Sequence, residues 1–259
     1  MQERLTIIKV GGKVVENAES LETFIQDFSK IAGHKILVHG GGRSATAIAE
    51  KLGIETKMVD GRRITDTDTL NVVVMVYGGL VNKNIVAQLQ TLNKSAIGLC
   101  GADLDLIRAK KREVKDVDYG YVGDVTSVNT EQLNDLIKNE VIPVIAPLTH
   151  DGKGQLLNTN ADTIAAELAK AFAMDFSVQL AYCFEKSGVL TDPNNDNSVI
   201  TNLNTELYQT YKDDGTISDG MIPKLDNGFS ALKHGVKQVL ISNSEGLKNG
   251  FSKGTQLEL

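Results

Sequence analysis

The chain has 259 residues and a net charge of −6, from 27 Lys+Arg and 33 Asp+Glu residues. This acidic balance argues against binding of nucleic acid or an anionic membrane through the bulk field, so positive charge for an anionic ligand must be local. A hydrophobic content of 41% and a charged content of 23% are typical of a soluble globular protein. The length allows one large α/β domain or two lobes.

Short apolar runs alternate with amphipathic stretches along the chain. The runs predict strands at residues 5–10, 35–39, 96–100, 143–147, 178–184 and 238–242. The amphipathic stretches predict helices at residues 18–32, 43–52, 68–90, 130–139, 162–174 and 222–234. Such alternation implies βαβ units, and therefore an α/β fold with a mainly parallel sheet that is covered on both faces.

Two segments depart from this alternation. Residues 103–125 are highly charged and alternate in places, which predicts an antiparallel hairpin or lid at the edge of the sheet. Residues 194–204 are polar and predict a loop. A boundary between two lobes is expected near Phe176, which divides the chain into residues 1–176 and 177–259.

Targeting and redox signals are weak. The first ten residues lack the basic start and apolar stretch of a signal peptide. The most apolar stretch, residues 72–81, is too short to span a bilayer and contains Gly78 and Gly79. Cys100 and Cys183 have no second thiol or histidine at metal-ligand spacing. A cytoplasmic location without a membrane partner is the expectation.

Three glycines, Gly40, Gly41 and Gly42, separate a predicted strand from a predicted helix. Glycines allow the backbone to approach an anion, and the N–H groups at a helix start point toward it. Gly40, Gly42 and Ala45 also fit a dinucleotide-binding pattern, with Asp60 twenty residues further on. That pattern follows the second strand rather than the first, and a simple tight turn is a third interpretation.

Two lysines occupy positions that are unfavourable without an anion. Lys9 lies near the end of an apolar strand and is followed by Gly11 and Gly12, so that its ammonium must reach solvent or a ligand. Lys224 lies in the first turn of a helix that contains Pro223, where a cation opposes the helix dipole unless an anion binds there. The alternative for both is a solvated surface lysine.

Polar residues also gather before the predicted helix at 162–174. An extended segment before this helix carries a polar residue at every second position, namely Asn158, Asn160 and Asp162. One of them can cap the helix, and capping does not require the other two. Arg62 and Arg63 each offer a guanidinium that can bind a carboxylate through two hydrogen bonds. Spacing does not decide between the two arginines.

The order of these motifs is more specific than any one of them. K-x-G-G, H-G-G-G, G-x-R-x-T, N-x-N-A-D and D-G-M-x-x-K together resemble the amino acid kinase family, and within it the branch that acts on acylated glutamate. The supporting stretches are residues 9–12, 38–42, 60–65, 81–89, 101–111, 158–162 and 218–225, so the resemblance spans nearly the whole chain.

The resemblance implies a three-layer αβα sandwich with a mostly parallel central sheet. It also implies an ATP-dependent phosphotransferase of arginine biosynthesis, with Mg²⁺ carried by the ATP phosphates, and a homodimer. N-acetyl-L-glutamate is the default substrate and N-succinyl-L-glutamate the alternative. The implied catalytic residues are Lys9, Lys224 and Asp162; the implied substrate-binding residues are Gly41, Gly42, Arg63, Asn158 and Asn160; and the implied ATP-binding residues are Gly11, Gly12, Ser187 and Gly188.

Some features depart from the family pattern or leave it open. In the stretch CFEKSGVLTD, Glu185 and Lys186 replace an Asp-Val pair, whereas Ser187 and Gly188 are kept. The chain begins almost directly with the first strand, which favours an enzyme that arginine does not inhibit. The remaining alternatives are a kinase of the same family for aspartate, glutamate, carbamate or UMP, an NAD-dependent dehydrogenase, and a non-catalytic sensor.

Overall fold

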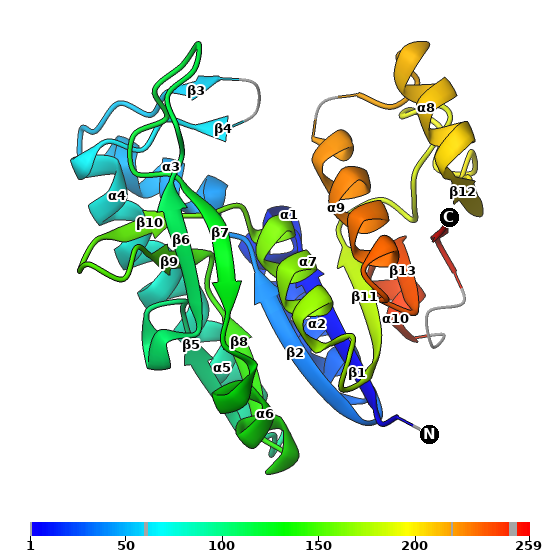
Figure 1. The fold of residues 1–259 in the computed structure, drawn as a ribbon, viewed down its shortest axis with the longest axis horizontal. Helices are drawn as coiled ribbons and strands as arrows, with labels where there is room; N and C mark the ends of the chain where they lie inside the picture. Colours follow the sequence, from blue (N-terminus) through cyan, green and yellow to red (C-terminus); the bar gives the residue numbers. More distant parts are fainter. Residues whose placement is uncertain (1, 60–61, 219, 249–252) are drawn as a thin grey trace.

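The computed structural model describes residues 2–59, 62–218, 220–248 and 253–259. Within these ranges, eight strands form a central sheet in the order β12-β14-β13-β11-β1-β2-β8-β5 (Figure 1). The six strands from β13 to β5 run parallel to their neighbours, and β14 pairs antiparallel to β13. The strands are β1 (Arg4–Val10), β2 (His34–His39), β5 (Ala96–Leu99), β8 (Ile142–Ile145), β11 (Ser177–Cys183), β12 (Asn202–Asn204), β13 (Gln238–Ser242) and β14 (Thr255–Glu258).

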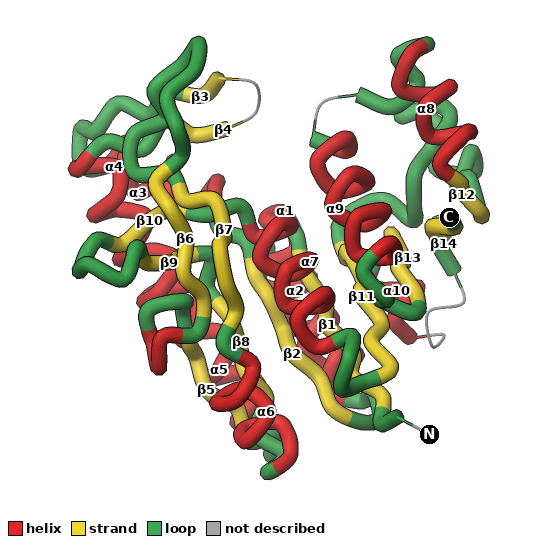
Figure 2. The backbone as a smooth tube through the Cα atoms, viewed as in Figure 1, coloured by secondary structure: helices red, strands yellow, loops and turns green. Residues whose placement is uncertain are grey.

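Helices cover both faces of this sheet (Figure 2). Strand β1 shows why, because Leu5 and Ile7 pack into one core and Ile8 and Val10 into the other. One face is covered by α6 (Thr130–Lys138), α7 (Ala161–Phe172), α8 (Thr205–Asp213) and α9 (Met221–Lys233), and the other by α2 (Ala18–Ser29), α3 (Gly42–Lys51), α4 (Thr67–Val73), α5 (Asn82–Thr91) and α10 (Ser244–Lys248). The expected three-layer αβα sandwich is confirmed.

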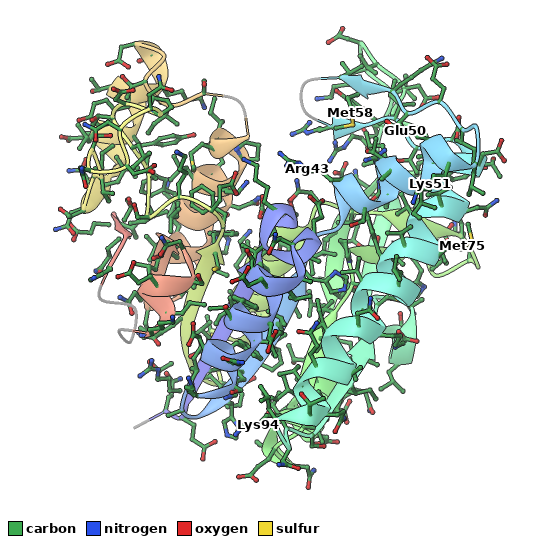
Figure 3. The ribbon with its side chains drawn as sticks, turned by 180° about the vertical axis from the view of Figure 1, so that it is seen from behind. Arg43, Glu50, Lys51, Met58, Met75 and Lys94 are labelled. Carbon is green, nitrogen blue, oxygen red and sulfur yellow. The ribbon has the colours of Figure 1, made fainter. Side chains whose placement is uncertain are left out.

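The helix predicted at residues 68–90 consists of three consecutive pieces. Between α4 and α5 lies a π-helical stretch, η1 (Val74–Val81). By length and composition alone the run Thr67–Thr91 could cross a membrane, but 44% of its most apolar window is buried. Val73, Val76 and Ile85 pack into the core, whereas Met75 points outward (Figure 3). This packing is that of a core helix with one exposed apolar edge.

Two local predictions need correction. The antiparallel hairpin within 103–125 exists as β6 (Ile107–Lys111) and β7 (Gly123–Val128), but it does not extend the central sheet. It belongs to a second sheet with β9 (Leu148–His150) and β10 (Leu156–Asn158), because β9 pairs with β6. The predicted loop 194–204 ends in the short strand β12. Shorter elements that sequence periodicity missed are α1 (Gly12–Glu16), β3 (Met58–Val59), β4 (Arg62–Arg63), α8, α10 and β14.

The topology creates one binding edge. The chain passes from β1 to β2 on one side, and β11 later pairs with the other side of β1. The carboxyl ends of these three parallel strands therefore meet where the order of connection reverses, which is where open α/β sheets bind ligands. Lys9 is the penultimate residue of β1 at this edge, where it pairs with Val38 of β2 and Tyr182 of β11.

Candidate active site

A carboxylate between two ammonium groups forms the centre of the site. Lys9 near the end of β1 places its Nζ 2.8 Å from Oδ1 of Asp162, and Lys224 in the first turn of α9 places its Nζ 3.1 Å from Oδ2. Asp162 lies in the first turn of α7 and is 5% exposed. Lys224 also donates to the carbonyl oxygen of Gly220 at 3.0 Å. The three predicted catalytic residues are thus brought together from three elements.

Asp162 is held in its ionised form by this arrangement. Burial alone raises the pKa of its carboxyl, but the ammonium groups of Lys9 and Lys224 outweigh burial, and the pKa lies below its ordinary value. Two cations then share one anion, which leaves an excess positive charge at the carboxyl ends of the strands. Such a cluster attracts an anionic ligand, because charges interact strongly where water is partly excluded.

The glycine loop and Arg63 form one wall. Arg63 in β4 is 9% exposed, and its Nη2 donates to the carbonyl oxygen of Gly42 at 2.7 Å and to Oγ1 of Thr46 at 2.8 Å. Arg62, its neighbour on β4, is exposed. The structure therefore separates the two arginines, which sequence spacing did not: Arg63 is fixed against the loop and Arg62 lies at the rim.

Gly41 is required by a close approach. A Cβ at this position would lie 2.9 Å from Cδ1 of Tyr77, closer than side chains pack. Tyr77 belongs to η1, is buried and lines the same pocket. Tyr77 was not predicted from the sequence. The feature that could have identified it is that it is the one hydroxyl-bearing aromatic residue in an otherwise apolar run.

A pocket of about 440 Å³ extends from the glycine loop to the start of α7 and α9. Asn158 lines it and donates from Nδ2 to Oγ1 of Thr65 at 3.0 Å. Asn160 also lines it, but its Oδ1 caps α7 by accepting from the N–H groups of Asp162 and Thr163 at 2.7 and 3.2 Å. The capping alternative is therefore correct for Asn160, and Asp162 lies inside the helix rather than in its lead-in.

Arg112 is a further cation of this pocket that sequence reasoning did not select. It follows β6, and its guanidinium binds the carboxylate of Asp124 on β7 through Nε and Nη2, at 3.0 and 2.5 Å from Oδ1. The guanidinium also lies over the ring of Tyr119. The feature that could have identified Arg112 is the run of basic residues in the segment that was predicted to be a hairpin or lid.

The K-x-G-G loop lies against the end of β11. The N–H of Gly11 donates to the carbonyl oxygen of Cys183 at 2.7 Å, and a Cβ on Gly11 would lie 3.2 Å from Cβ of Phe184. Gly12 begins the short helix α1. This loop therefore joins the glycine-loop side of the edge to the residues that follow β11.

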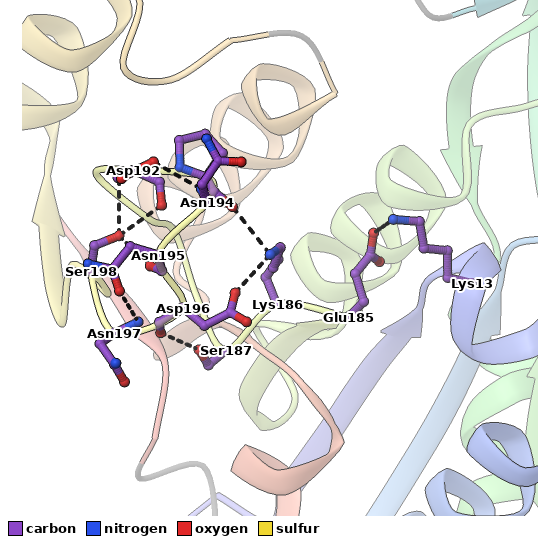
Figure 4. Close-up of polar contacts among 11 residues, drawn as sticks. Lys13, Glu185, Lys186, Ser187, Asp192, Asn194, Asn195, Asp196, Asn197 and Ser198 are labelled. Carbon is purple, nitrogen blue, oxygen red and sulfur yellow. Dashed lines mark hydrogen bonds and ion pairs between the residues drawn. The ribbon is translucent and has the colours of Figure 1, made fainter.

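The residues that depart from the family pattern form ion pairs (Figure 4). Glu185 pairs with Lys13 of α1 at 2.5 Å, and Lys186 pairs with Asp196 at 2.8 Å. Ser187 turns its hydroxyl toward the carbonyl oxygen of Asp196 at 3.4 Å. Lys186 and Ser187 therefore both contact Asp196 in the loop 192–198, and they connect this loop to the segment after β11.

A smaller pocket of about 140 Å³ lies beside this loop. Gly188 lines it together with Phe184, Leu190 and Met221. A Cβ on Gly188 would lie 2.7 Å from Oγ1 of Thr255, so a larger residue would clash with Thr255. Of the two residues kept from the family pattern, Gly188 is part of the pocket wall.

Two predicted features need separate mention. Asp60, the acid of the dinucleotide interpretation, lies outside the described residues, as does Gly61. Within the described ranges no group of three or more His, Cys, Asp or Glu side chains is placed to hold a metal ion. Asp162, the carboxylate at the centre, is already paired with two cations.

Sequence comparisons place these features in a family. The profile of the amino acid kinase family matches residues 4–243. The acetylglutamate kinase of Bacteroides thetaiotaomicron is 58% identical over 258 residues, which cover 100% of both chains. The acetylglutamate kinase of Phocaeicola vulgatus is 60% identical over 250 residues, covering 96% of this chain and 97% of that protein.

The fold is found in solved structures as well. A crystal structure of a protein from Streptococcus mutans UA159 aligns with a TM-score of 0.82 and 28% sequence identity, covering 98% of each chain. The match of the family profile, the full-length similarity and the shared fold agree. This chain belongs to the amino acid kinase family.

Proposed function

We propose that this chain transfers the γ-phosphoryl group of ATP to the γ-carboxylate of N-acetyl-L-glutamate, a step of arginine biosynthesis. Its full-length relatives are named for this activity. The observation that carries the proposal is the Lys9–Asp162–Lys224 cluster at the carboxyl ends of the strands. It lies where the K-x-G-G loop, the glycine-loop pocket and the start of α9 meet.

The inventory of side chains suits this chemistry. A γ-carboxylate has no proton to lose when it attacks phosphorus, so the reaction needs no general base. The obstacle is the approach of two anions, and the negative charge spread over the transferring phosphoryl group must be stabilised. Lys9 and Lys224 supply that stabilisation, and Asp162 fixes the positions of both ammonium groups by pairing with each of them.

The acylglutamate is assigned to residues 1–176. The N–H groups of Gly41 and Gly42 bind its γ-carboxylate, and Arg63 binds its α-carboxylate as a cation already fixed by two hydrogen bonds. Asn158 contacts the same ligand from the opposite wall. Asn160 contributes by capping α7 and thereby placing Asp162.

The nucleotide is assigned to residues 177–259. Gly188 and Phe184 line the pocket beside the loop 192–198, and Gly11 and Gly12 lead from there to the two lysines. The Mg²⁺ enters as part of the substrate MgATP, bound by its phosphates. Ser187 acts on the nucleotide through the loop that its hydroxyl contacts.

The test is trapping of the acyl phosphate with hydroxylamine. Purified protein is incubated with MgATP and N-acetylglutamate, N-succinylglutamate, glutamate, aspartate or carbamate. Turnover of an N-acylglutamate supports the proposal, and turnover of a free amino acid or carbamate alone moves the chain to another branch of the family. A Lys9→Met variant gives the background level of trapped product. Product formation no higher than this background on every acceptor refutes kinase activity on these acceptors.

A specific observation also favours N-succinyl-L-glutamate as the substrate. Besides Arg63, the pocket is lined by Arg62 and Arg112, whereas N-acetylglutamate offers one carboxylate other than the reacting one. A succinyl group carries a further carboxylate, which a guanidinium binds well. A preference for the succinyl substrate that is lost in Arg112→Gln supports this alternative, and equal preference in both proteins contradicts it.

We further propose a cytoplasmic homodimer that does not bind membranes. Large apolar side chains are exposed near the outer end of the sheet, namely Met75 and Leu80 on η1 and Ile97 on β5. β5 is the last strand of the sheet on that side. Burying such side chains between two copies is favourable. Sedimentation velocity gives a dimer for the wild type and a monomer for Met75→Glu; a monomeric wild type contradicts the proposal.

A further inference from the structure

The histidine of the H-G-G-G motif has no role in the chemistry above, although it is fully buried. His39 is 0% exposed and ends β2 directly before the glycine loop. Its Nδ1 lies 2.7 Å from the carbonyl oxygen of Gly40, and its Nε2 lies 3.1 Å from Nδ2 of Asn82. Asn82 begins α5, is 1% exposed and belongs to the stretch 81–89 that the function left unused.

The surrounding bonds determine which nitrogen of His39 carries the proton. Nδ2 of Asn82 faces the carbonyl oxygen of Val144 at 2.9 Å, and its Oδ1 faces the ammonium of Lys83 at 3.2 Å. A carbonyl only accepts and an ammonium only donates, so the amide orientation of Asn82 is fixed. The amide nitrogen then donates to Nε2 of His39, and the ring proton must be on Nδ1, which donates to Gly40.

Burial keeps the imidazole in this neutral form. It lowers the pKa of His39 to about 4, with a further lowering from Lys83, against the raising effect of the bond to Gly40. At neutral pH the ring therefore has one donor and one acceptor, and both are used. The chain Lys83, Asn82, His39, Gly40 is a hydrogen-bonded series that runs from the protein surface to the glycine loop.

The bond to Gly40 has a consequence on the opposite side of the peptide. In a planar trans peptide the C=O and the following N–H point in opposite directions. Because the carbonyl of Gly40 is held toward the buried ring, the N–H of Gly41 is directed away from it. Gly40 and Gly41 line the pocket of about 440 Å³ described above, and His39 does not. Between two glycines the peptide would otherwise rotate easily.

We propose that His39, oriented by Asn82, is a positioning residue that holds the Gly40–Gly41 peptide so that the Gly41 N–H faces the acylglutamate. The inference rests on the proposed function of the glycine loop. If the peptide turned over, a carbonyl oxygen would face the substrate carboxylate, and a favourable donor would become a repulsive acceptor. The residue acts through the backbone and touches no reacting atom.

Two isosteric substitutions separate positioning from packing. In His39→Asn, the side-chain amide nitrogen can take the place of Nδ1 and keep the bond to Gly40. In His39→Gln, the amide reaches the place of Nε2 and keeps the bond to Asn82 but not the one to Gly40. Gln preserves more of the buried volume, so a packing role predicts that His39→Gln is the milder change.

Positioning predicts the reverse order in activity. We expect kcat/KM for the acylglutamate to fall about 10²-fold in His39→Gln and less than about 10-fold in His39→Asn, since loss of one such donor costs about 10²–10³-fold. The KM for ATP changes less than about twofold in both, because the nucleotide lies elsewhere. Equal losses, or losses that follow the melting temperatures of the variants, overturn the proposal.

A measurement without turnover keeps the two proposals apart. Nitrogen-15 NMR of uniformly labelled protein reports the protonation of each histidine ring nitrogen, and we expect Nδ1–H with an unprotonated Nε2 throughout the neutral range. Addition of N-acetylglutamate should shift the Gly41 amide in wild type and not in His39→Gln. A protonated Nε2 refutes the positioning role whatever the activity, whereas the expected spectra without any turnover refute only the proposed function.

Discussion

The loops that follow β2 and β11 lie on either side of β1 but are held in different ways. After β2, His39, Asn82 and Arg63 make hydrogen bonds that are buried or nearly so. After β11, Glu185 and Lys186 make ion pairs with partly exposed partners, and the side chains of Lys13 and Glu185 are 47% and 38% exposed.

This difference has energetic meaning. A buried hydrogen bond is costly to break because its donor and acceptor cannot turn to water. An exposed ion pair contributes about 0–1 kcal/mol and is screened by salt. The glycine-loop side is therefore preorganised before substrate binds, whereas the loop after β11 can change its conformation at a small cost in free energy. Under the proposed function, the small acid binds on the fixed side and the long, flexible nucleotide on the adaptable side.

The largest effect is expected where the two regions meet. Lys9→Met removes a cation that both substrates share under the proposed function, and it leaves Asp162 with Lys224 alone. We expect kcat to fall about 10²–10³-fold, as for loss of one transition-state donor, with smaller changes in both KM values. Steady-state kinetics measure this. Lys13→Met, on the exposed pair, is the control and should cost less than about fivefold; a similar loss in both variants would contradict the distinction.

The buried side should also be visible in the pH dependence of stability. The pKa of His39 is lowered from 6.5 to about 4 in the folded protein, chiefly by burial. The unfolded state then binds a proton that the folded state refuses, so stability is complete above pH 6.5 and is lost as pH falls toward 4. The full loss is about 3 kcal/mol.

Urea unfolding at several pH values tests this loss. Carboxylates contribute over part of the same window, so the informative quantity is the difference between wild type and His39→Asn, in which this group no longer titrates. We expect the free energy of unfolding of the wild type to fall more steeply between pH 6.5 and 4. Parallel curves for the two proteins would mean that the folded ring accepts a proton readily.

Arg63 and Arg62 compare a fixed and a rim cation within the glycine-loop side. Arg63→Gln should raise the KM for N-acetylglutamate about 10–100-fold, because a charge-assisted contact is lost together with the bonds to Gly42 and Thr46. Arg62→Gln is the matched control, with a change below about threefold for this substrate. Equal effects would show that both guanidinium groups bind the α-carboxylate.

The smallest effect is expected at the ion pair after β11. A double-mutant cycle on Lys13→Gln and Glu185→Gln should give a coupling of about 0.2–1 kcal/mol that decreases with added salt. Unfolding in urea at low and high ionic strength measures it. A coupling above about 2 kcal/mol that persists in salt would mean that the pair is as well protected as His39.

Most of the fold could be predicted from the sequence because its signals are local. The runs at 35–39 and 238–242 are β2 and β13 almost to the residue, since buried parallel strands read as continuous apolar stretches. The assignment of 103–125 to the sheet edge was wrong because pairing partners are not local: β9, which pairs with β6, lies far along the chain.

The site divides in the same way. Lys9 and Lys224 were identified because each is a lysine where its element alone would not favour one, and Asp162 because it belongs to a run of polar residues that exceeds the need for one helix cap. The order of the motifs then implied their catalytic roles. The contact of Tyr77 with Gly41, and the presence of Arg112 in the same pocket, depend on segments that meet only in the folded chain. The choice of Arg63 over Arg62 likewise required the tertiary direction of a two-residue strand.

The central position of β1 also bears on how the chain is made. Arg4 on β1 pairs with Ser177 on β11, so β1 leaves the ribosome well before β11, and its second edge stays uncovered until β11 is made. At about 5–20 residues per second, that edge stays bare for roughly ten seconds or more. An unpaired apolar strand is a site of misassembly during this interval. The strand order therefore requires that nascent β1 be protected until β11 emerges.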